Sequence, residues 1–248
     1  MKAQLKTHPL KRSRTLARLA LSLASSLAFM GLVQAPLGAS AQVPPSAQEV
    51  AQFSALHAAA HRGNVAAIDA AASAKVDLDA RDSYGRTPLH VAVFAKQREA
   101  LRPLVKAGAN INLLENDRYD GITIASVADD EETLRVLIQL GASAKQTTSR
   151  YDGTALIAAA HLGHDGVVRQ LIAAGAPLDH VNNLHWTAVI ESIVLGDGGK
   201  RHQATLEALI KAGANLQLAD RAGNTPLALA RQRGYGAMVR MLVAAGAR

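Results

Sequence analysis

An internal period of about 33 residues constrains this chain more than any other feature, because it dictates how every segment packs. Six residues suited to begin a helix recur at spacings of 33, 33, 34, 33 and 38 residues: Ser54, Thr87, Asp120, Thr154, Thr187 and Thr225. Each has a side-chain oxygen that can accept a hydrogen bond from a free N–H group in the first helical turn. Such a period indicates stacked units, none of which buries its apolar face alone.

The same two-helix pattern follows each of these N-cap residues. An apolar residue stands two positions after the cap and a small residue five positions after it, as Leu89 and Ala92 do after Thr87. A second apolar stretch then ends at a glycine, which can terminate a helix in the left-handed conformation. These glycines are Gly108, Gly141, Gly175, Gly213 and Gly246. The first unit has Lys75 there, so we expect a looser end to its second helix.

Two segments carry a resemblance to a known family. Asp82-x-x-Gly85-x-Thr87-Pro88-Leu89-His90 and Leu104-Val105-Lys106-Ala107-Gly108-Ala109-Asn110-Ile111-Asn112 resemble the ankyrin repeat motif, and the likeness extends over about residues 48–248. The resemblance implies an all-α repeat solenoid of six stacked helix-turn-helix repeats joined by finger-like hairpin turns. We predict an ankyrin repeat domain at 51–248, with repeats at about 51–81, 82–116, 117–148, 149–181, 182–219 and 220–248.

The segment before the repeats has the layout of an export signal. Six basic residues and no acid occupy its first 18 positions, an apolar run covers 19–33, and Ala39-Ser40-Ala41 supplies small residues for cleavage. We predict a signal peptide at 1–41 and a periplasmic mature protein. The alternative is an uncleaved anchor, for which the apolar run is short. A linker and N-terminal cap follow at 42–50, where Ser46-x-x-Glu49 predicts a capping box.

Removing this leader changes the charge of the protein. The whole chain has 27 Lys and Arg residues against 20 Asp and Glu, and a formal charge of +7. The leader holds six of the basic residues and none of the acids, so the mature chain has a net charge of +1. Nucleic-acid binding depends largely on cations that neutralise phosphate. We therefore predict no nucleic-acid partner, and after cleavage a monomer without a membrane attachment.

Aromatic residues are scarce, at 3% of the chain, and most of those beyond the leader fall in the turns between repeats. The resemblance makes these turns the fingers, and Tyr, Trp and Arg are enriched in binding hot spots. We predict a non-catalytic scaffold that binds a protein partner through its fingers and inner helices. The predicted partner-binding residues are Tyr84, Arg86, Phe94, Tyr119, Arg150, Tyr151, His161 and Trp186. The alternative is that the rings only brace adjacent fingers.

A glycine-rich insertion at 196–203 gives the fifth repeat five extra residues. Backbone N–H groups there, with Lys200, Arg201 and His202, could surround an anion. The alternative function is therefore a small-ligand, anion or metal-binding protein, or an enzyme, centred on this insertion; the structural alternative is an elongated solvated turn. His57 and His61 lie four apart but lack a visible third metal ligand. Without a known catalytic motif, we predict no catalytic residue, metal or cofactor.

Overall fold

A computed structural model describes residues 44–248 of the chain, and the predicted signal peptide lies outside the described residues. The described part is helical throughout, with one isolated bridge between Thr148 and Gly153 as its β-structure. Within this part, none of the helices has both the length and the apolar character that crossing a bilayer would require. The predicted all-α solenoid is confirmed.

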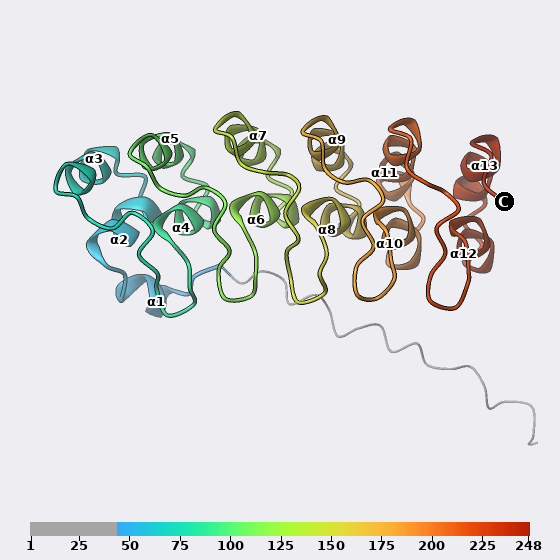
Figure 1. The fold of residues 1–248 in the computed structure, drawn as a ribbon, viewed down its shortest axis with the longest axis horizontal. Helices are drawn as coiled ribbons and strands as arrows, with labels where there is room; N and C mark the ends of the chain where they lie inside the picture. The colour runs from blue at the N-terminus through green and yellow to red at the C-terminus, as the bar shows by residue number, and fades with distance from the viewer. Residues whose placement is uncertain (1–43) are drawn as a thin grey trace, which may run out of the picture. The chain divides into compact units, whose positions relative to one another are not determined.

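Twelve of the helices form six pairs, preceded by α1 (Ala47–Ala51). The pairs are α2 (Ala55–His61) with α3 (Val65–Ser73), α4 (Pro88–Phe94) with α5 (Arg98–Lys106), α6 (Gly121–Val127) with α7 (Glu131–Gln139), α8 (Ala155–Leu162) with α9 (Asp165–Ala173), α10 (Ala188–Val194) with α11 (Lys200–Lys211), and α12 (Pro226–Gln232) with α13 (Gly236–Ala244). First helices make an inner row, second helices make an outer row, and the fingers project beyond the inner row (Figure 1).

Each inner helix begins at one of the six residues that set the period. The side chain of each cap accepts a hydrogen bond from the N–H group three residues on, as Thr87 does from His90. Ser46 and Glu49 form the predicted capping box at the start of α1. Because each cap fixes where its helix starts, the period of the caps becomes the period of the stack.

The core is one continuous layer between the two rows. The apolar residues two positions after the caps are each at most 4% exposed, and they are Leu56, Leu89, Ile122, Leu156, Val189 and Leu227. The small residues five positions after the caps let neighbouring helices approach closely, and they are Ala59, Ala92, Ala125, Ala159, Ser192 and Ala230. Burying a Leu or Ile side chain contributes about 1.5–3 kcal/mol. Inner helices of neighbouring repeats also contact one another, as α2 does with α4 and α8 with α10.

Buried histidines tie an inner helix to the finger that follows. His90 Nδ1 accepts a hydrogen bond from the Thr87 N–H group at 3.1 Å, so its Nε2 carries the hydrogen that it donates to the Leu113 carbonyl at 3.0 Å. Burial lowers the pKa of His90 to about 4, so the ring is neutral at pH 7. His57 makes the matching contact with the Arg86 carbonyl at 2.9 Å.

Backbone hydrogen bonds also join one finger to the next. Asn116 donates to the Tyr84 carbonyl at 3.0 Å, Ser149 to the Arg118 carbonyl at 2.9 Å, and Asn183 to the Tyr151 carbonyl at 2.9 Å. The donor and acceptor of each bond lie about one repeat apart in the sequence. The fingers are therefore held by their neighbours as well as by their own turns.

The five predicted terminal glycines all adopt the left-handed conformation, with φ between 78° and 109°. Lys75 takes the same conformation at φ 57°. Its helix also closes with the same hydrogen bond, from Val76 to the Ala71 carbonyl at 3.0 Å, as Ala109 makes with Leu104 in the next repeat. The end of this helix therefore closes with the same geometry as the others, and its looser attachment stays a prediction. The lysine holds a backbone conformation that glycine adopts with less steric strain.

Lys75→Gly is expected to raise the free energy of unfolding by about 0.5–1 kcal/mol, because it removes this strain at an exposed position. Gly108→Lys, at the equivalent position of the second repeat, should lower it by more than that, because the φ of 109° at Gly108 lies farther from the left-handed region that a lysine tolerates. Urea unfolding followed by circular dichroism measures both changes. A Lys75→Gly variant less stable than the parent would contradict the account.

Candidate protein-binding surface

The aromatic residues of the fingers divide into exposed and packed rings. The fingers are numbered along the chain from the first, which joins α3 to α4, to the fifth, which joins α11 to α12. Tyr84 lies on the first finger and is 51% exposed. Tyr151 is half-buried, while Tyr119 and Trp186, each just before a cap, are half-buried and pack against the core. Half of the Tyr84 surface is thus accessible to a partner, whereas Tyr119 and Trp186 also pack at the bases of their fingers.

The predicted site residue Arg86 lies inside the first finger and is only 3% exposed. Its Nε donates to Asp82 Oδ2 at 2.7 Å, and its terminal NH2 group donates to Glu49 Oε1 at 3.3 Å. The guanidinium carbon also lies 4.5 Å from the centre of the Tyr84 ring, which is a cation–π arrangement. Arg86 therefore finds its partners within this chain.

Two ion pairs connect the third finger with the second. Arg150 lies 3.4 Å from Asp117, and Arg118 lies 2.8 Å from Asp152. All four side chains are about half exposed or more, and such pairs contribute about 0–1 kcal/mol each. A partner can therefore replace either pair at little cost, which leaves Arg150 available at the surface.

The inner helices place Phe94 and His161 at the ends of α4 and α8. Phe94 is half-buried and packs against the core. His161 Nδ1 lies 3.2 Å from Glu191 Oε2, and Asn182 donates to Glu191 Oε1 at 3.0 Å. Glu191 is 4% exposed, so these polar neighbours satisfy a carboxylate that would otherwise be costly to bury.

Sequence reasoning missed Glu191, although the repeats contain a signal for it. The position four residues after the cap holds an apolar residue in the five other repeats: Ala58, Val91, Ile124, Ala158 and Leu229. A carboxylate at one such position breaks a pattern that the packing favours. Aligning the repeats on their caps and searching for a charge at an apolar position would have found it.

The insertion lengthens a helix as well as a turn. α11 has 12 residues where the other outer helices have nine, and the remaining extra residues lie in the turn before it. Lys200 is exposed as the first residue of α11. Tyr235 of the following repeat donates its hydroxyl hydrogen to the Gly196 carbonyl at 2.8 Å. The insertion is therefore anchored from the sixth repeat.

The other two basic residues of the insertion contact groups of this chain. Arg201 lies 2.9 Å from Asp129 and 3.3 Å from Asp165, which belong to the two preceding repeats. His202 Nδ1 lies 2.8 Å from Asp197 Oδ1, and its Nε2 lies 3.0 Å from the His161 carbonyl. The structure thus turns both side chains toward neighbouring repeats, where they connect the third, fourth and fifth repeats.

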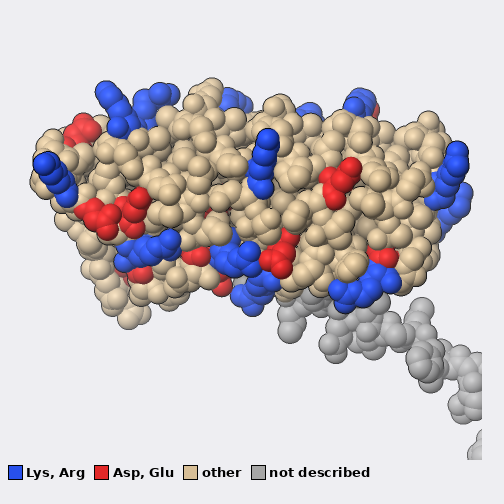
Figure 2. All heavy atoms as spheres, viewed as in Figure 1, with Lys and Arg blue, Asp and Glu red and all other residues tan. Residues whose placement is uncertain are grey.

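Acidic and basic side chains are interspersed on the face shown in Figure 2, and neither sign covers a large continuous area.

Within residues 44–248, no three His, Cys, Asp or Glu side chains are grouped so that they could hold a metal ion. Both ring nitrogens of His57 are engaged, one with Ser54 Oγ at 2.8 Å and the other with the Arg86 carbonyl.

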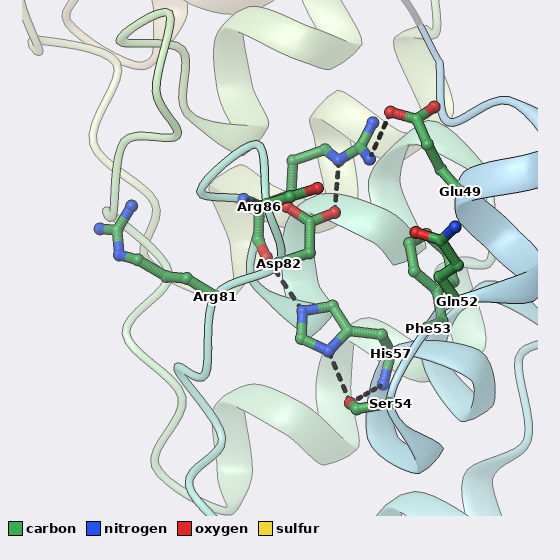
Figure 3. A pocket seen from close by; sticks show the side chains of 9 residues that line it. Glu49, Gln52, Phe53, Ser54, His57, Arg81, Asp82 and Arg86 are labelled. Carbon is green, nitrogen blue, oxygen red and sulfur yellow. Dashed lines mark hydrogen bonds and ion pairs between the residues drawn. The ribbon is translucent and has the colours of Figure 1, made fainter.

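A pocket of ≈ 260 Å³ lies where α1 and the start of α2 meet the first finger (Figure 3). Its lining residues are Glu49, Gln52, Phe53, Ser54, His57, Arg81, Asp82, Ser83 and Arg86. The pKa of Glu49 is lowered to about 2, chiefly by the hydrogen bond from the Ser46 N–H group and also by Tyr84 and Arg86. The sequence indicated the cap role of Glu49 but not this contact with the finger.

Comparison with known proteins identifies the class to which this architecture belongs. The family model for ankyrin repeats (3 copies) matches residues 21–115 and 122–220, which is more than half of the chain. The protein is therefore a member of the ankyrin repeat family. It is 40% identical over 100 residues to the ankyrin repeat protein YahD of Escherichia coli (strain K12); the match covers 40% of this chain and 50% of YahD, so the chain spans about half the length of that relative.

Solved structures of similar proteins share the fold. An ankyrin repeat domain from Acinetobacter baumannii AYE is 44% identical, with a TM-score of 0.73, and the match covers 78% of this chain and 98% of that one. The ankyrin repeat protein EF0377 is 29% identical, with a TM-score of 0.70, and the match covers 76% of this chain and 96% of that one. Ankyrin repeats indicate a scaffold for protein–protein interaction, and the fold is typically non-catalytic.

Glu49→Gln is expected to lower the free energy of unfolding at pH 7, because Gln can keep the capping-box hydrogen bond but loses the ion pair with Arg86. A carboxyl whose folded pKa is depressed stabilises the fold above its ordinary pKa of 4.5, and this contribution is lost as the pH falls toward about 2. The difference between variant and parent should therefore shrink between pH 4.5 and pH 2.

Urea titrations at a series of pH values, followed by circular dichroism, measure this difference. Glu207→Gln is the matched control, because Glu207 pairs only with the exposed Lys211 on α11. Its effect should be small at every pH. A Glu49→Gln effect that stays constant from pH 7 to pH 2 would argue against an ionised Glu49 as the stabilising group.

Proposed function

We propose that this protein is an exported, periplasmic scaffold that binds a protein partner with the surface formed by its fingers and inner helices. The observation that carries the proposal is that exposed finger residues are fixed in position before any partner arrives. Tyr84 and Tyr151 sit on fingers whose backbones bond to the next finger at 3.0 and 2.9 Å. Preorganised side chains lose less conformational entropy when they bind.

The composition of this surface supports a protein partner. Tyr84 and Tyr151 offer aromatic area with a polar tip, and Arg150 offers an exposed guanidinium. These are residue types that contribute strongly to protein interfaces. His161 and Phe94 extend the surface onto the inner helices. Repeat solenoids commonly bind along such extended surfaces.

A solved structure with the same fold comes from a protein complex. It contains the Bd0816 predatory endopeptidase from Bdellovibrio bacteriovorus with the immunity protein Bd3460, and the matched chain is 24% identical with a TM-score of 0.64. This likeness concerns the fold alone. The existence and identity of a partner for this protein must come from experiment.

Replacing Tyr84 and Tyr151 together by Ala is expected to weaken partner binding by tenfold or more. Each substitution removes aromatic contact area from a finger and leaves the core closed. The partner is first isolated by cross-linking in intact cells and identified by mass spectrometry. Its affinity for each variant is then measured by biolayer interferometry.

The matched control replaces Arg102 and Arg135 by Ala. Both are exposed on outer helices, α5 and α7, away from the fingers. This control variant should bind as the parent does, and circular dichroism should show all variants folded. Unchanged affinity after loss of both tyrosines would remove the fingers from the interface.

If the protein is exported as proposed, its N-terminal segment should be removed. The protein recovered from the periplasmic fraction of a Gram-negative host should begin at Gln42, because Ala39 and Ala41 provide small residues before that bond. N-terminal sequencing checks this directly, and Ala41→Arg should block cleavage. A chain that keeps its first residues, or that stays in the cytoplasmic fraction, would contradict the proposal.

A further inference from the structure

The first finger contains a buried cation that is already oriented by its own turn. Asp82 accepts hydrogen bonds from the backbone N–H of Arg86 at 2.9 Å and from its Nε at 2.7 Å. These contacts stay within one finger and aim the guanidinium toward the pocket of Figure 3. The remaining terminal nitrogens point away from Asp82, where a second acceptor can meet them.

That second acceptor comes from outside the repeats. Glu49 Oε1 lies 3.3 Å from the terminal NH2 group of Arg86, and Glu49 belongs to α1, which precedes the first repeat. The Tyr84 ring flanks the same guanidinium, whose carbon lies 4.5 Å from the ring centre, and Glu49 is the main reason why the pKa of Tyr84 is raised. Glu49 therefore meets Arg86 beside the Tyr84 ring.

The element that supplies Glu49 is only lightly attached. α1 has five residues and none of them is buried. The finger side of the contact is different, because the Arg86 side chain is 4% exposed and firmly held by Asp82. A rigid, buried receptor group thus faces a short surface helix. In a packed core both sides of a contact are buried. Here only Arg86 is buried and α1 is not, as expected when an exchangeable group occupies a binding site.

We propose that Tyr84 and Arg86 form a carboxylate-binding site on the first finger, that Glu49 is its internal occupant, and that an acidic side chain of the protein partner takes its place. This inference rests on the proposed scaffold function and specifies the partner's chemistry at one point. When the partner binds, α1 leaves the finger and Arg86 exchanges one carboxylate for another.

The free hydrogen-bond donors of Arg86 favour one further carboxylate. Arg81 also lines the pocket, but its guanidinium turns away and donates to the Gly85 and Leu114 carbonyls, so Arg86 is the cation that faces Glu49 (Figure 3). Leaving Arg86 with only Asp82 would bury a poorly satisfied cation, which is costly. A doubly charged phosphate would instead face Asp82 at close range. The site therefore suits a Glu or Asp side chain, held by the planar guanidinium of Arg86 beside the Tyr84 ring.

The site can be tested with the segment that fills it. The probe is a fluorescent peptide of residues 44–53, added to the full chain and followed by anisotropy. A second peptide carries Gln at the position of Glu49. Each is titrated into the parent protein and into the Glu49→Gln variant, in which the internal carboxylate is absent but the finger is unchanged. Circular dichroism checks that the variant is folded.

The Glu49→Gln protein should bind the natural peptide at least tenfold more tightly than the Gln peptide, and at least tenfold more tightly than the parent protein does. Equal binding of the two peptides, or no binding of either, would overturn the inference. No external partner enters this experiment, so such a failure would not affect the scaffold proposal. That proposal is tested separately by the Tyr84 and Tyr151 substitutions.

Discussion

The contact between neighbouring repeats is the interaction on which the rest of this structure depends. Each inner helix contributes one large apolar residue, such as Leu89, and one small residue, such as Ala92, to a layer completed by the next repeat. Hydrogen bonds add to this packing: buried histidines bond an inner helix to the finger that follows it, and backbone groups bond one finger to the next. A repeat taken alone would lose most of this burial, so stability belongs to interfaces rather than to units.

This dependence also explains how the surface can be ready to bind. A finger is a turn without a core of its own, and an isolated turn of that kind would be mobile. Here the backbone of Tyr151 accepts a hydrogen bond from the next finger, and the ring of Trp186 packs against the core. The same forces that stack the repeats therefore position the side chains that a partner meets.

Local patterns predicted the fold well, and long-range pairings explain what they missed. The caps and terminal glycines act within a few residues, so the six helix pairs followed from the sequence. The burial of Arg86 depends on Glu49, which is 37 residues away, and the role of Arg201 depends on Asp129, 72 residues away. No local pattern encodes such pairs. Lys75 departs from the local pattern, because a lysine there takes the left-handed conformation that the pattern assigns to glycine.

The most direct test of the central claim is site-specific photo-cross-linking in living cells. A benzoylphenylalanine is placed at Tyr151, on a finger, and in a second strain at Arg135, on the outer helix α7. If the fingers form the interface, position 151 gives a protein adduct and position 135 gives none. An adduct that forms equally from both, or only from position 135, would show that the fingers do not form the interface.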